Sequence, residues 1–119
     1  MKKQTQAIHS RFQTKDAYGS LAMPVYHTAA YEFDNATEMA DAFCGKTDAP
    51  DYSRVTNPTV TYFENKVKAM CNAHGVIAVS SGMAAISNTL ICLTAAGKNI
   101  VTSRHLFGNT YSLIAGTMM

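Results

Sequence analysis

The sequence predicts an α/β fold with a parallel sheet, because helical and strand-like segments alternate along its second half. Residues 76–79 and 99–102 are short apolar runs rich in β-branched side chains, as expected of buried strands. An apolar helical segment, 83–95, lies between them, so the two strands should be joined by a right-handed crossover. Two strands do not make a stable open sheet. We therefore expect residues outside this chain, or other chains, to complete it.

Two further helices are expected before the first strand, and both have clear start signals. Asn35 is expected to cap the first helix, with Glu38 three residues later as a capping box requires. Asn57 followed by Pro58 is expected to begin the second helix, which should end at Gly75. Apolar residues recur along the second helix at helical spacing: Val60, Phe63, Val67, Met70 and Cys71.

The segment 83–95 is apolar on nearly all sides, so this helix is expected to be buried and to stop at Gly97. A last helix is expected from around Gly108 to the end of the chain. Residues 1–33 carry no strong periodicity, although 24–28 suit a short extended piece. A segment of this length without its own core usually lies on another surface, so we interpret it as an arm.

The composition limits the classes of function. The chain has 119 residues, of which 47% are hydrophobic and 15% charged, enough for one domain with a core. A formal charge of +2 and scattered basic residues argue against a nucleic-acid partner. Cys44, Cys71 and Cys92 are odd in number and lack metal-binding spacing. We therefore expect no metal site, no disulfide framework and a reduced, cytoplasmic setting.

Neither a secretory signal nor a membrane span is expected. The first residues are basic, but the residues after them contain no apolar segment of the signal-peptide type. Residues 76–96 carry no charge, yet serine, threonine, asparagine and glycine residues interrupt this run. A buried strand, turn and helix explain it better than a membrane span.

Two parts of the sequence have the chemistry to hold a phosphate. Tyr52 and Arg54 stand together in a polar loop, where arginine supplies a fixed positive charge and tyrosine a hydroxyl donor. Gly82 stands where a strand is expected to give way to a helix, and the N–H groups of a helix N-terminus favour an anion. Taken singly, each also has a structural explanation, as an ordinary loop pair or as tight strand–helix packing.

Three motifs in this order and spacing resemble the Cys/Met-metabolism family of pyridoxal-phosphate (PLP) enzymes. They are Tyr-Ser-Arg-x-x-Asn-Pro-Thr at 52–59, Ser-Ser-Gly-Met-Ala-Ala-Ile at 80–86 and Phe-Gly-Asn-Thr-Tyr at 107–111. The resemblance covers essentially all of this chain but only the N-terminal part of a family enzyme. It implies an N-terminal arm and the start of a fold-type-I PLP-enzyme large domain, a parallel sheet with helices on both faces that is incomplete here.

The resemblance implies roles for the matched residues. The backbone N–H groups of Gly82 and Met83 would bind the phosphate of PLP, and Phe107 would stack on its pyridine ring. Tyr52 and Arg54 would reach across a dimer interface to the phosphate of the neighbouring subunit's cofactor. The implied partner is a second copy of the chain, in a homodimer or homotetramer. Residues 1–56 would form the arm and phosphate-contacting loop, and residues 57–119 the first part of the PLP-binding domain.

Departures from the family pattern bear on the reaction. The family usually has tyrosine where this chain has Phe107, so a proton-transfer role of that hydroxyl is not carried over. Methionine γ-lyases typically have cysteine where this chain has Asn109, which favours a sulfhydrylase. The Schiff-base lysine, in a Ser-x-Thr-Lys motif, and the aspartate that pairs with the pyridine nitrogen lie further downstream in the family. We give no weight to Thr14-Lys15 as a match, and we expect no catalytic residue and no turnover in this chain alone.

The resemblance favours one reaction over its alternatives. The expected parent is a sulfhydrylase that replaces the γ-acyl group of O-acetyl- or O-succinyl-homoserine with sulfide or a thiol, in methionine or homocysteine synthesis. A γ-lyase or a cystathionine γ-synthase on the same scaffold is the alternative. An alternative of another class is a non-catalytic cofactor-domain or dimerisation fragment.

Overall fold

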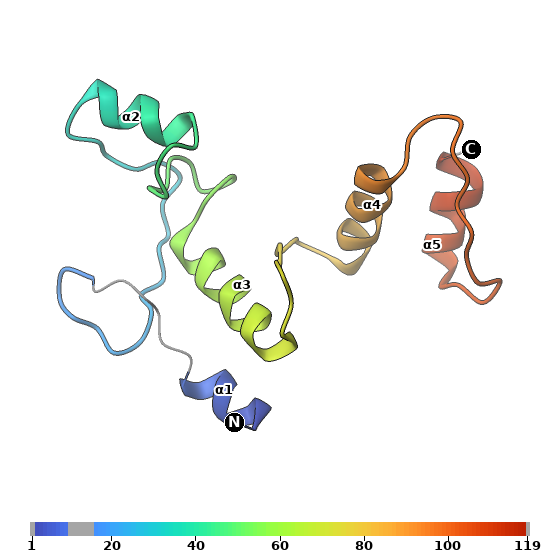
Figure 1. The fold of residues 1–119 in the computed structure, drawn as a ribbon, viewed down its shortest axis with the longest axis horizontal. Helices are drawn as coiled ribbons and strands as arrows, with labels where there is room; N and C mark the ends of the chain where they lie inside the picture. The colour runs from blue at the N-terminus through green and yellow to red at the C-terminus, as the bar shows by residue number, and fades with distance from the viewer. Residues whose placement is uncertain (1, 10–15, 119) are drawn as a thin grey trace. The chain divides into compact units, whose positions relative to one another are not determined.

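The computed structural model describes residues 2–9 and 16–118, and the chain divides into two compact units, Met1–Ile77 and Ala78–Met119 (Figure 1). Helices make up nearly all the regular structure of the described residues. The first unit holds three helices: α1 (Lys3–His9), α2 (Ala36–Phe43) and α3 (Pro58–Cys71). The second unit holds α4 (Gly82–Leu93), α5 (Gly108–Ser112) and η1, one turn of π-helix (Leu113–Thr117).

The helices expected after residue 33 are all present, and α1 is an addition. Its seven residues carry no capping signal in the sequence, and in the structure α1 contacts α3. Thr14 and Lys15, the short match to the family's lysine motif, lie outside the described residues. None of the described helices has both the length and the hydrophobicity that crossing a membrane requires.

The cap of α2 is as predicted, with one difference in the hydrogen bonds. Asn35 has an extended backbone, and its side-chain oxygen accepts from the Glu38 N–H at 2.9 Å. In a capping box the glutamate returns to the backbone N–H of the cap. Here the Glu38 carboxylate instead accepts from the side-chain amide of Asn35, at 2.9 Å. The carboxylate in the first turn still suits the positive end of the helix dipole.

Helix α3 begins as predicted but ends before Gly75. Asn57 caps it, its side-chain oxygen accepting from the Thr59 N–H at 2.9 Å, and Pro58 is the first helical residue. The helix ends at Cys71 because Asn72 adopts the left-handed conformation, with φ 52° and ψ 42°. Asparagine is the residue that most often replaces glycine at such a position, so the prediction of Gly75 as the terminator is wrong.

Asn72 should therefore contribute to stability by adopting the left-handed conformation at low cost. We expect Asn72→Ala to lower the free energy of unfolding of the full-length protein by about 1 kcal/mol, because a Cβ without the compensating polar group is strained there. Asn72→Gly should keep or raise stability, since glycine adopts positive φ freely. Urea denaturation measures both variants, and an alanine variant as stable as the glycine variant would contradict this account.

The expected parallel sheet is not formed within the described residues. Segments 76–79 and 99–102 are not strands in the described structure, and Ile77 and Val101 are 85% and 97% exposed. The only β pairing described is an isolated antiparallel bridge between Ala30 and Tyr52. Strands need neighbours for their backbone groups, which is why the sequence predicted a sheet completed from outside this chain.

The expected burial of α4 is also not found. None of its residues is buried, and Ile91 and Leu93 are exposed. The helix begins at Gly82 and ends at Leu93, and Gly97, with φ 79°, lies in the turn after it. Apolar surface on all sides of a helix is usually covered by other elements, so these side chains are candidates for packing against the rest of a larger domain.

Candidate functional site

Tyr52 and Arg54 project from one tight turn in the first unit. The carbonyl oxygen of Tyr52 accepts hydrogen bonds from the N–H groups of Val55, at 2.8 Å, and of Thr56, at 2.9 Å. These two bonds close the turn around the residues between them. Both candidate side chains are therefore carried by a hydrogen-bonded backbone rather than by an open loop.

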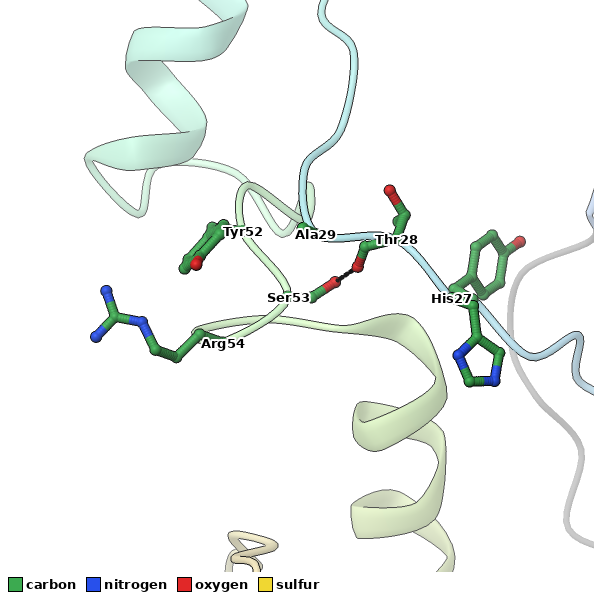
Figure 2. Close-up of a pocket in the computed structure, with 7 residues that line it drawn as sticks. His27, Thr28, Ala29, Tyr52, Ser53 and Arg54 are labelled. Atoms are coloured by element: carbon green, nitrogen blue, oxygen red, sulfur yellow. Dashed lines mark hydrogen bonds between the residues drawn. The ribbon is translucent and has the colours of Figure 1, made fainter.

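The arm passes directly beside this turn. Tyr52 forms its bridge with Ala30, and the Ser53 N–H donates to the carbonyl oxygen of Ala29 at 3.0 Å. The two segments line an open hollow, whose lining residues are Tyr26, His27, Thr28, Ala29, Tyr52, Ser53 and Arg54 (Figure 2). The arm thus lies, as expected, on another part of the structure.

The donors of Tyr52 and Arg54 are available for a ligand. The guanidinium carbon of Arg54 lies 5.4 Å from the centroid of the Tyr52 ring, within the range of a cation–π contact. Figure 2 shows both side chains pointing to the same side of the turn. In the described ranges, no carboxylate lies within ion-pairing distance of Arg54. An exposed arginine without a counter-ion, beside a phenol, is suited to an anion such as a phosphate.

Asp51 closes the base of the same turn. Its oxygen Oδ1 accepts from the Thr56 hydroxyl at 2.7 Å and from the Tyr52 N–H at 2.6 Å. The Thr56 hydroxyl first, and the Tyr52 N–H next, hold the pKa of this exposed carboxyl below its ordinary value of 3.8. Asp51 therefore supports the turn, and it does not form an ion pair with Arg54.

This arrangement should make the turn weaken in acid. Because the pKa of folded Asp51 is lowered, its stabilising effect is fully present above pH 3.8 and is lost as the pH falls through the lower, folded pKa. Thr56→Val removes the largest cause, so the pKa of Asp51 should rise towards 3.8 in an NMR titration of its carboxyl carbon. An unchanged pKa would show that the Thr56 hydroxyl does not hold the carboxylate.

The second group of candidates lies at the N-terminus of α4. Ser81 caps this 12-residue helix, its hydroxyl accepting from the Ala84 N–H and its carbonyl from the Ala85 N–H, both at 3.1 Å. The N–H groups of Gly82 and Met83 have no hydrogen-bond acceptor in the part of the chain that the structure describes. A Cβ built on Gly82 would meet no atom within 4 Å. Packing within this chain therefore does not require a glycine here, and the same holds for the other glycines.

The second unit brings Met83 and the segment of Phe107 together. The Thr110 hydroxyl, at a residue that is only 8% exposed, donates to the sulfur of Met83 at 3.7 Å. Phe107 stands immediately before α5, which Thr110 helps to hold against α4. Its side chain is 72% exposed in this chain, as are other apolar side chains that a larger domain would cover, such as Ile77 and Val101.

The five predicted residues therefore fall into two groups. Tyr52 and Arg54 belong to the first unit, and Gly82, Met83 and Phe107 belong to the second. Each group by itself has hydrogen-bond donors or an aromatic face without a partner among the described residues. No group of three or more His, Cys, Asp and Glu side chains that suits a metal ion is found in those residues.

The comparisons with known proteins identify the family. The sequence-family model of the Cys/Met metabolism PLP-dependent enzymes matches residues 4–119 of this chain. The chain belongs to this family. The cofactor of the family is PLP, as the three sequence motifs implied.

The relatives that match this chain include proteins named as a γ-lyase and as a sulfhydrylase. An L-methionine gamma-lyase of Fusobacterium nucleatum subsp. polymorphum is 41% identical over 110 residues, which are 92% of this chain and 28% of the relative. An O-acetyl-L-homoserine sulfhydrylase of Corynebacterium glutamicum is 38% identical over 116 residues, 97% of this chain and 26% of the relative. The chain thus spans about a quarter of the length of these curated relatives.

A solved structure supports the same assignment. A Campylobacter jejuni protein solved under the name O-acetylhomoserine (thiol)-lyase matches this chain with a TM-score of 0.89 and 32% sequence identity. The match covers 99% of this chain and 29% of that one, and that structure carries N'-pyridoxyl-lysine-5'-monophosphate at position 205. The backbone of this chain therefore follows that of a PLP-dependent enzyme.

The donors found here fit the phosphate of PLP. A phosphate needs positive charge and several N–H or O–H donors, which Arg54 and Tyr52 offer in one unit and the start of α4 offers in the other. Glycine at the first position of α4 carries no Cβ that would stand in the way of a group close to the backbone. The chemistry of both groups agrees with the cofactor of the family.

Proposed function

We propose that this chain is part of a PLP-dependent sulfhydrylase that replaces the γ-acyl group of O-acetyl- or O-succinyl-homoserine with sulfide or a thiol. The observation that carries the proposal is the set of phosphate donors, at Arg54 and at the start of α4, that have no partner among the described residues, in a chain of this family. PLP supplies an electron sink for the departure of the γ-substituent. The name and reaction of the Corynebacterium relative support the choice.

The chain's own residues would bind and orient the cofactor. The N–H groups of Gly82 and Met83 would donate to its phosphate, and the positive end of the α4 dipole would add to the attraction. Phe107 would hold the pyridine ring by stacking and, lacking a hydroxyl, would move no proton. Tyr52 and Arg54 would donate to the phosphate of the cofactor in a partner subunit of a homodimer or homotetramer.

The proposal extends to the fold of the whole protein. Residues 57–119 would begin a parallel sheet with helices on both faces, and residues 1–56 would form the arm and the phosphate-contacting loop. The exposed side chains of Ile77 and Val101 support this, because neighbouring strands and helices would cover them. The protein would act in a reduced, cytoplasmic setting.

A γ-lyase is the second candidate. One observation favours the lyase, and another favours the sulfhydrylase. The 41% identity to a methionine gamma-lyase supports elimination. Asn109, which follows Phe107 where methionine γ-lyases typically have cysteine, supports replacement. We favour replacement because this position lies beside the ring platform, where it would influence the reaction directly.

The test compares the two reactions on the full-length protein with PLP. We expect O-acetyl-L-homoserine and sulfide to give homocysteine and acetate faster than L-methionine gives ammonia and methanethiol. Faster release of ammonia from methionine would establish the lyase instead. Absence of both products, in a preparation that holds PLP, would favour a non-catalytic role.

The attachment of the cofactor gives an independent check. Borohydride reduction of the full-length protein, followed by peptide mapping, should label a lysine outside residues 1–119. A protein that is colourless and gains no activity with added PLP would contradict the proposal.

A further inference from the structure

The hydroxyl of Ser53, the residue between Tyr52 and Arg54, is the centre of a hydrogen-bond network. It donates to the carbonyl oxygen of Thr28, as Figure 2 shows. The side-chain amide of Asn57 lies 2.9 Å from it, and the hydroxyl of Tyr31 lies 3.1 Å away.

The directions of these bonds follow from the number of protons. A serine hydroxyl has one proton to donate and two lone pairs. The proton of Ser53 goes to Thr28, so Asn57 and Tyr31 must both donate to the Ser53 oxygen. The hydroxyl therefore has its full set of three hydrogen bonds, in a residue that is half-buried while Tyr52 and Arg54 are exposed.

The side chain of Asn57 makes more bonds than a helix cap requires. Its oxygen caps α3 through the Thr59 N–H, which serine or aspartate would do equally well. Its amide nitrogen additionally donates to Ser53, at 2.9 Å, and to the carbonyl oxygen of Tyr26, at 3.1 Å. Only an amide side chain supplies that acceptor and those two donors together.

The network joins three segments of the first unit. The hydroxyl of Thr59, in α3, accepts from the Tyr26 N–H at 2.9 Å and donates to the carbonyl oxygen of Pro24 at 3.3 Å. Together with Ser53 and Asn57, these bonds tie the arm to the turn and to the start of α3. A turn that is already fixed loses less conformational freedom when a ligand binds to it.

We infer that Ser53 and Asn57 are positioning residues, which hold the turn so that Tyr52 and Arg54 bind the phosphate of PLP at full strength. The inference rests on the proposed function, because it assigns the network to that same site. Neither residue touches the ligand in this scheme. They act through the geometry of the turn.

The first test measures PLP binding by the full-length protein, by titrating the apoprotein and following the absorbance. Ser53→Ala should raise the Kd about three- to tenfold, which corresponds to the loss of one or two hydrogen bonds. Ser53→Thr, which keeps the hydroxyl, should restore most of the affinity. Ser20→Ala is the matched control, since it removes a hydroxyl that donates only to Asp16, at 2.7 Å, in another turn.

The second test isolates the amide of Asn57. Asn57→Ser keeps a capping oxygen but loses the two amide donors, so it should weaken PLP binding by a similar factor. The control is Asn35→Ser at the cap of α2, where the amide donates to Glu38 instead. Asn35→Ser should leave the Kd unchanged. If Ser53→Ala does not fold, Asn57→Ser and Tyr31→Phe test the same network.

A double-mutant cycle separates positioning from a general loss of structure. In an Arg54→Ala background, Ser53→Ala should raise the Kd by a smaller factor than in the unmodified protein, because one of the two side chains that it positions is gone. An equal effect in both backgrounds would overturn the inference. So would an unchanged Kd in Ser53→Ala while Arg54→Ala weakens binding, and the proposed function would then stand. An unchanged Kd in Arg54→Ala itself would instead refute the proposed role of Arg54.

Discussion

Replacing Arg54 by alanine is expected to raise the Kd of the full-length protein for PLP about ten- to a hundredfold. The guanidinium has no counter-ion among the described residues, so it is free to form charge-assisted hydrogen bonds with the phosphate. Such bonds are worth about 1.5–3 kcal/mol each, which gives this range. Titration of the apoprotein with PLP measures the effect directly.

Lys46→Ala is the control for a loss of positive charge. Lys46 forms an ion pair with Asp41 at 2.8 Å on the surface. An exposed pair of this kind contributes about 0–1 kcal/mol to stability, so its loss should leave PLP binding unchanged. Equal Kd values for Arg54→Ala and Lys46→Ala would contradict a specific phosphate contact.

The helix starts could be predicted because their signals are local. Asn35 and Asn57 cap helices through the N–H groups two or three residues later, and Pro58 fixes the first helical residue. The end of α3 was predicted less well, since both Asn72 and Gly75 can adopt the left-handed conformation. Asn72, which comes first in the chain, ends the helix, and residue preferences alone do not decide between the two positions.

The sheet depends on contacts that a local pattern does not contain. Residues 76–79 and 99–102 have strand-like composition, but their backbone groups need neighbouring strands. The described residues supply none, so composition predicted the segments without their pairing. The same reasoning applies to α4, whose apolar surface predicted burial that this chain does not provide.

Candidate site residues could be proposed from the sequence where a side chain's chemistry was enough. Tyr52, Arg54 and Gly82 were proposed because a cation, a phenol and a helix start suit a phosphate. The network of Ser53 was not, because its partners Thr28 and Tyr31 stand more than 20 residues earlier in the chain. The motif contained both Ser53 and Asn57, and only the fold of the arm shows what they contact.

Mixing two impaired variants of the full-length protein, at a PLP concentration that fills the intact site but not the Arg54→Ala site, is expected to restore activity if subunits share cofactor sites. One variant carries Arg54→Ala, and the other lacks the lysine that binds PLP. In a hybrid dimer, one site combines an intact Arg54 from one subunit with an intact lysine from the other. We therefore expect activity well above either variant alone, approaching that of one good site per hybrid dimer.

The position of Arg54 on its turn leaves it available to a ligand. The side chain is exposed, has no counter-ion in the residues described and is held beside Tyr52. Exchange of subunits has to be confirmed by mass, for example with one variant isotopically labelled. If hybrids form and activity stays at the level of the single variants, Arg54 serves the cofactor of its own subunit. The test of Ser53 would remain valid in that case, because positioning of Arg54 does not depend on which subunit holds the phosphate.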